Sequence, residues 1–125
     1  MTKILIVDDS RTAVALLQVF LVGRDVQLFV ARDGAEALEA GHSIAPDLVV
    51  TDAEMPRMDG YALCAAIRSD PALRAIPVVL LTSHGDAESR RRAAAAGASA
   101  FLTKPATPAA LRTAVRDLLG AAAPA

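Results

Sequence analysis

Five short runs of apolar, largely β-branched residues recur along this chain, and each interval between them leaves room for one helix. The runs cover residues 3–7, 26–31, 47–51, 77–82 and 99–103, so their starts lie 23, 21, 30 and 22 residues apart. Parallel strands need a crossover connection of at least about a dozen residues, usually a helix. The spacing predicts an α/β fold: a doubly wound sheet of five parallel strands, covered on both faces.

Helix signals lie between the runs. Val14, Leu17 and Leu21 recur with helical spacing in the first interval. The predicted fourth helix, 87–96, holds three consecutive arginines and several alanines but no large apolar residue. We therefore expect it to be weakly anchored to the sheet. The predicted N-caps are Asp33, Asp59, Asp86 and Thr107, and the predicted helix ends are Gly97 and Gly120.

Composition excludes several classes of function. With 13 basic and 14 acidic side chains, the net charge is −1, so neither nucleic acid nor an anionic membrane is an expected partner. No apolar stretch approaches the ~20 residues of a membrane span or resembles a secretory signal. Cys64 is the single cysteine, and the cytoplasm is the expected compartment. We expect one domain over 1–119, with 120–125 a C-terminal tail or linker stub.

Polar residues follow four of the predicted strands. Carboxyl ends of parallel strands share one edge of an open sheet, which is where such folds bind ligands. The residues that should meet there are Asp8, Asp9, Asp52, Thr82, Ser83 and Lys104.

The charged residues of this set also have simpler interpretations. Asp8 or Asp9 could cap the first helix, Asp52 could be an ordinary loop residue, and Lys104 could be a solvated surface charge. However, 11 of the 13 basic residues are Arg, so a Lys here favours a role for a compact point charge.

The charges of this cluster favour a bound cation. Two carboxylates about 5 Å apart repel by roughly 3 kcal/mol at an effective dielectric constant of about 20. Three carboxylates and one Lys leave a charge near −2, which protonation or a divalent cation would relieve. Oxygen ligands favour Mg²⁺, with Mn²⁺ as a substitute, and a hard metal beside hydroxyls and a Lys suits a phosphoryl group.

Four segments of the chain together carry a family resemblance. They are Asp8-Asp9, Asp52 with Met55-Pro56 and Met58-Asp59-Gly60, Leu81-Thr82-Ser83, and Phe101-Leu102-Thr103-Lys104-Pro105. In these segments the chain resembles the receiver domain of two-component response regulators, particularly single-domain chemotaxis proteins, over residues 3–119. The resemblance implies a flavodoxin-like (βα)5 fold with strand order 2-1-3-4-5.

The resemblance implies a role for each site residue. Asp52 would accept a phosphoryl group from a phosphohistidine. Asp9, Asp52 and the backbone carbonyl of Glu54 would hold Mg²⁺, and Asp8 would act mostly through the metal's waters. Lys104 would pair with Asp52 and then with a phosphoryl oxygen, and the bond before Pro105 would be cis.

The remaining implied roles concern switching. Thr82 and Ser83 would bind the phosphoryl group, and Phe101 would turn inward when Thr82 moves. Glu54 and His84 would tune the loss of the phosphoryl group. The side chain of Glu54 could also reach the metal or pair with Lys104.

The expected function is therefore a phosphorylation-activated switch, not a turnover enzyme, which assists its own phosphorylation and dephosphorylation. Its implied partners are a sensor histidine kinase or histidine phosphotransfer protein, and a downstream protein at the surface of the fourth helix, fifth strand and fifth helix. The oligomeric state is open between a monomer and a phosphorylation-dependent dimer.

The alternative functions are a phosphatase resembling haloacid dehalogenases and a receiver that serves only as an interaction module. A flavodoxin is disfavoured because aromatic residues make up only 3% of the chain.

Overall fold

Five strands alternate with five helices along the chain. The computed structural model describes residues 1–120. The expected tail or linker stub, 120–125, lies outside the described part except for Gly120. The strands are β1 (Thr2–Val7), β2 (Val26–Ala31), β3 (Leu48–Asp52), β4 (Val78–Thr82) and β5 (Ala100–Thr103). The helices are α1 (Arg11–Leu21), α2 (Gly34–Ile44), α3 (Gly60–Ser69), α4 (Ala87–Ala96) and α5 (Pro108–Leu119).

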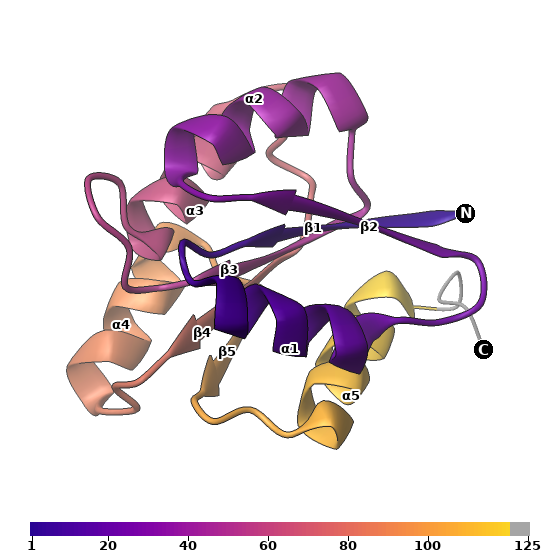
Figure 1. Ribbon diagram of the computed structural model, residues 1–125. Helices are drawn as coiled ribbons and strands as arrows, with labels where there is room; N and C mark the ends of the chain where they lie inside the picture. The colour runs from indigo at the N-terminus through magenta and orange to yellow at the C-terminus, as the bar shows by residue number, and fades with distance from the viewer. Residues whose placement is uncertain (121–125) are drawn as a thin grey trace.

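All strand pairs are parallel, and their order in the sheet is β2-β1-β3-β4-β5, which confirms the predicted topology. The strands therefore end at the same edge (Figure 1). The boundary of β3 differs by one residue from the expectation, because Asp52 still pairs with Leu81 of β4 and is the last residue of the strand. The carboxylate of Asp52 is thus carried by the rigid sheet and not by a loop.

Helices cover the sheet in two layers. α1 and α5 lie on one face and α2 and α3 on the other (Figure 1), with α4 next to α3. The pleat divides β1 between two cores, because Ile4 and Ile6 pack toward α1 and α5 whereas Leu5 and Val7 pack toward α2 and α3. None of the helices within residues 1–120 is both long enough and apolar enough to cross a bilayer.

Helix ends follow the predicted pattern with one correction. The four predicted N-caps are confirmed, since each side chain accepts a hydrogen bond from a backbone N–H three residues later. α1 is capped by Ser10, whose hydroxyl accepts from the N–H of Ala13, so the interpretation of Asp8 or Asp9 as its cap was wrong. Ser10 has the position and the side-chain oxygen that an N-cap needs. Neither aspartate is therefore needed as a cap, and both remain at the sheet edge.

Contacts between α4 and the rest of the domain are few and partly polar. Ala93 is its one buried residue, which agrees with the weak anchoring of this helix to the sheet predicted from its sequence. Two exposed arginines of α4 add contacts that the sequence did not predict. The guanidinium of Arg90 lies 5.5 Å from the centre of the Phe101 ring, and that of Arg92 lies 4.1 Å from the centre of the Tyr61 ring.

A single arginine joins the C-terminal ends of α3 and α4. Arg68 donates through Nε to the carbonyl of Gly97 (2.8 Å) and through Nη1 to the carbonyls of Arg74 and Ile76. Its Nη2 donates to Ser99 Oγ. Arg68 thereby connects the segments that lead into β4 and β5 and holds them in place.

Candidate functional site

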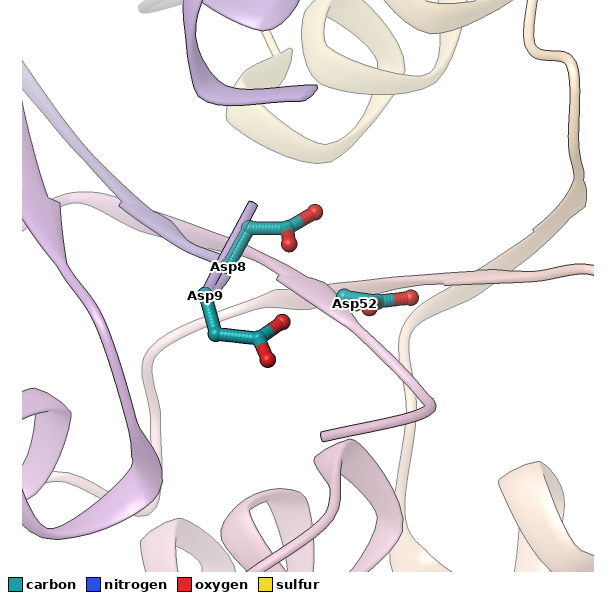
Figure 2. Close-up of side chains that lie close together, drawn as sticks. All are labelled: Asp8, Asp9 and Asp52. Carbon is teal, nitrogen blue, oxygen red and sulfur yellow. The ribbon is translucent and has the colours of Figure 1, made fainter. Parts of the chain in front are cut away.

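Three aspartates meet at the edge where the strands end. Asp8 and Asp9 follow β1, and Asp52 ends the neighbouring strand β3. One carboxylate oxygen from each residue lies within 4.8 Å of those of the other two. Figure 2 shows the three carboxylates extending from the ends of the two strands into the same region. The three carboxylates form a candidate metal site.

Asp8 is the most constrained of these carboxylates. Asp8 is buried, and its Oδ1 accepts a hydrogen bond from the N–H of Ser10 at 2.9 Å. Burial raises the pKa of Asp8 above its ordinary value, and the nearby charges of Asp52 and Asp9 act in the same direction. The Ser10 N–H and the Lys104 ammonium oppose this rise only in part.

Lys104 brings a positive charge into the cluster from the end of β5. Its Nζ lies 2.5 Å from Oδ1 of the buried Asp52. The backbone of Lys104 is held by the sheet edge, because its N–H donates to the carbonyl of Thr82 at 2.7 Å. The peptide bond between Lys104 and Pro105 is cis.

Glu54 makes contacts that the sequence did not predict. Its Oε2 accepts from the Thr82 hydroxyl at 2.8 Å, and its Oε1 accepts from the Ser83 N–H at 3.0 Å. Within residues 1–120, Glu54 forms no ion pair with Lys104, so the interpretation that these two side chains pair was wrong. Burial raises the pKa of Glu54, but the Ser83 and Thr82 hydrogen bonds and the Lys104 charge outweigh it, and the net pKa is lowered.

Thr82 is buried at the end of β4 and Ser83 follows it at the surface. Phe101, in β5, is partly buried against the cluster formed by Ala53, Tyr61, Leu80 and Ala93. The same ring lies under the guanidinium of Arg90. Phe101 thus touches both the core beneath the site and the outer surface of α4.

Close backbone approach explains Gly60 at the start of α3. A Cβ at this position would collide with the carbonyl oxygen of Asp52 and would lie 2.8 Å from Cα of Ala53. The N–H of Gly60 also donates to the carbonyl of Ala53 at 2.9 Å. Glycine therefore lets the loop after β3 fold tightly back against the residue that carries the central carboxylate.

Two histidines and the cysteine are not part of the carboxylate cluster. His84 is exposed, although its N–H donates to Thr82 Oγ1 at 3.0 Å. His42 is exposed and lies 2.7 Å from a carboxylate oxygen of Asp70. Cys64 is fully buried within α3, and burial raises the pKa of its thiol. Both histidines are thus at the surface, and the thiol lies inside the domain.

A pocket that the sequence did not predict opens beside Glu54. It has a volume of about 370 Å³ and is lined in part by Glu54, Tyr61, His84 and Arg92. Arg92 is held there by its ion pair with Asp59 and by the Tyr61 ring. Three adjacent arginines in a helix indicate solvent exposure, so no sequence signal identified the ring beneath one of them.

Comparison with known proteins gives one consistent family. Residues 4–116 match the family described as response regulator receiver domain. The chain is 39% identical over 116 residues to Response regulator PleD of Caulobacter vibrioides, covering 93% of this chain and 26% of that protein. It is 36% identical over 117 residues to the probable transcriptional regulator ycf27 of Guillardia theta, covering 94% and 45%. The chain therefore spans a quarter to a half of the length of these relatives.

Solved structures give the same result. The signal receiver domain of a signal transduction histidine kinase from Syntrophus aciditrophicus superposes with a TM-score of 0.88 at 40% identity, covering 95% of this chain and 90% of that one. Chemotaxis protein CheY4 of Vibrio cholerae superposes with a TM-score of 0.88 at 29% identity, covering 95% and 99%.

Proposed function

Because this chain belongs to the family of response regulator receiver domains, we propose that it is a phosphorylation-activated switch with Asp52 as its phosphoacceptor. The observation that carries this proposal is the contact between Lys104 Nζ and the buried carboxylate of Asp52, next to two further carboxylates. An ammonium there can hold an attacking carboxylate and then stabilise charge on the transferred group.

The reaction is a displacement at phosphorus. An Asp52 carboxylate oxygen forms a bond to the phosphorus of a phosphohistidine, and the bond from phosphorus to the imidazole nitrogen breaks. The nitrogen keeps the electron pair and takes up a proton, and Asp52 becomes an acyl phosphate. Lys104 then moves from the carboxylate to a phosphoryl oxygen.

The site fits Mg²⁺, because it gathers carboxylate oxygens from three residues within 4.8 Å of one another, and Mg²⁺ prefers oxygen ligands. Asp9, Asp52 and the backbone carbonyl of Glu54 would hold the ion, and Asp8 would bind its waters. When bound, Mg²⁺ neutralises charge on the phosphoryl oxygens and on the carboxylates. Mn²⁺ would substitute because it accepts the same ligands.

The signal would leave the site through Thr82, Ser83 and Phe101. The Thr82 hydroxyl and the Ser83 N–H would bind phosphoryl oxygens, and Phe101 would turn inward as Thr82 moves. The contact of Phe101 with Arg90 supports a route to the surface of α4, β5 and α5. Glu54 and His84 flank the site and would tune hydrolysis of the acyl phosphate, which makes the domain assist its own dephosphorylation.

The partners follow from this chemistry. A sensor histidine kinase or histidine phosphotransfer protein would supply the phosphoryl group, and a downstream protein would bind the α4-β5-α5 surface. We assign the receiver to residues 1–119 and treat 120–125 as a tail or linker. The compartment proposed is the cytoplasm, in keeping with the family and with a cysteine that is buried and free.

Intact mass spectrometry tests the proposal. Wild-type protein incubated with Mg²⁺ and acetyl phosphate should gain one phosphoryl group, and the Asp52→Ala variant should gain none. Absence of the adduct on the wild type, or an equal adduct on Asp52→Ala, would contradict the proposal. A phosphatase resembling haloacid dehalogenases would instead turn over a chromogenic phosphomonoester steadily, and a receiver that serves only for interaction would do neither.

A further inference from the structure

We propose that the Glu54 carboxylate competes with the phosphoryl group for the Thr82 hydroxyl and the Ser83 N–H. This inference rests on the proposed function and concerns the unphosphorylated protein. Glu54 would be a positioning residue that holds both donors until Asp52 is modified. The carboxylate bridges them through two different oxygens, at 2.8 Å and 3.0 Å.

A count of donors makes the competition unavoidable. A threonine hydroxyl has one proton to donate. Oγ1 of Thr82 already accepts from the N–H of His84 at 3.0 Å, so its proton is directed to Glu54 Oε2. A phosphoryl oxygen can receive this proton only after Glu54 releases it.

The same count applies to Ser83. Its backbone carries one N–H, and that N–H donates to Glu54 Oε1. Hydrogen bonds to an ionised carboxylate are stronger than those between neutral groups, so both donors are firmly engaged. One carboxylate thus occupies the two donors that two phosphoryl oxygens would need.

Charge repulsion would drive the exchange, because a phosphoryl group on Asp52 adds negative charge close to Glu54. The pocket of about 370 Å³ beside Glu54 gives the released side chain a place to move. Arg92 lines this pocket and can attract the carboxylate. Glu54 is exposed, so the movement needs no rearrangement of the core.

Binding of beryllofluoride in the presence of Mg²⁺ tests the competition, because this ion mimics a phosphoryl group on a carboxylate. The variant Glu54→Gln keeps the size of the side chain but loses its charge and one acceptor oxygen. We expect this variant to bind beryllofluoride about tenfold or more tightly than the wild type. Glu88→Gln is the matched control: Glu88 is an exposed carboxylate in the first turn of α4, and its replacement should leave the affinity unchanged.

The amide signal of Ser83 in a two-dimensional NMR spectrum gives a direct readout without metal or beryllofluoride. In the wild type this amide should resonate at the low field typical of a hydrogen bond to a carboxylate. Glu54→Gln should move it upfield, and Glu88→Gln should not. A structural role of Glu54 elsewhere would not move this one resonance selectively.

A double-mutant cycle localises the competition. In a Thr82→Val background, where one contested donor is absent, Glu54→Gln should increase the affinity by a smaller factor than in the wild type. An unchanged or weaker affinity of folded Glu54→Gln, or an unshifted Ser83 amide, would overturn the inference. Failure of the wild type itself to bind beryllofluoride would overturn the proposed function, while the Ser83 measurement would still decide whether Glu54 holds its donor.

Discussion

Arg68 and Gly97 are fitted to each other at the end of the domain opposite the carboxylates. The Arg68 guanidinium donates to the Gly97 carbonyl, and the side chain lies so close that a Cβ on Gly97 would come within 2.7 Å of Arg68 Cγ. Gly97 also has a φ of +88°, a left-handed conformation that ends α4. The glycine is therefore required both by its backbone conformation and by its neighbour.

The first prediction concerns this pair. Gly97→Ala should lower the free energy of unfolding by about 2 kcal/mol, because backbone strain and the collision with Arg68 add. In an Arg68→Ala background the same substitution should cost only about 1 kcal/mol, the strain alone. Urea denaturation of the four proteins measures both costs, and equal costs in the two backgrounds would contradict the fitted contact.

The second prediction compares the only two lysines. Lys104→Met should slow phosphorylation by acetyl phosphate by about 100-fold, since it removes the ammonium next to Asp52. Lys104→Arg should not restore the rate, because the larger planar guanidinium of Arg does not replace the compact ammonium of Lys. Lys3→Met is the control: Lys3 donates to the Ile44 carbonyl at the start of β1, and its replacement should leave the rate unchanged. Mass spectrometry over time measures the rates; a wild-type rate in Lys104→Met would exclude this role.

The third prediction concerns the metal. Mg²⁺ should raise the melting temperature by a few degrees, because it binds the folded cluster and not the unfolded chain. Asp9→Asn should remove most of the shift, whereas Asp117→Asn, an exposed position on α5, should retain it. Thermal unfolding monitored by circular dichroism at several Mg²⁺ concentrations checks this, and a full shift in Asp9→Asn would show that the ion binds elsewhere.

The fourth prediction is a pH dependence in metal-free buffer. The pKa of Asp8 is raised in the folded protein, chiefly by burial. The folded state then binds more protons than the unfolded state between the ordinary pKa of 3.8 and the raised value. Asp8 therefore makes the protein less stable as the pH rises through that interval.

Asp8→Asn removes this effect while keeping an oxygen that can accept from the Ser10 N–H. At pH 7 in EDTA, the variant should be more stable than the wild type, and the difference should vanish as the pH falls below the ordinary pKa of 3.8, where Asp8 is protonated in both states. Chemical denaturation at several pH values measures it. A constant difference across the range would point to packing and not to charge.

Strand and helix positions could be predicted because local patterns determine them. The continuous apolar runs are strands buried on both faces, and Asp33, Asp59, Asp86 and Thr107 cap the helices as their residue types indicate. The meeting of Asp8, Asp9 and Asp52 also followed from the sheet alone, since parallel strands end at one edge.

The details that escaped prediction depend on side-chain conformations across long separations. Glu54 could reach several groups, and only the packed site shows that it bonds to Thr82 and Ser83. Arg68 finds acceptors on segments as far apart as Arg74 and Ser99. An arginine such as Arg92 can be exposed to solvent and still stack on a ring, so exposure alone did not reveal the contact with Tyr61.

The alanine-rich inner face of α4 has a consequence for the speed at which a signal can pass. Large side chains interlock across a helix interface, and a helix that shifts must force them over rotational barriers. Ala93, the one buried residue of α4, has no side-chain rotamers to rearrange. The rate at which α4 rearranges should therefore be limited by breaking the arginine contacts at its surface and not by repacking beneath it. The helix could then shift quickly in response to movements that begin at the site.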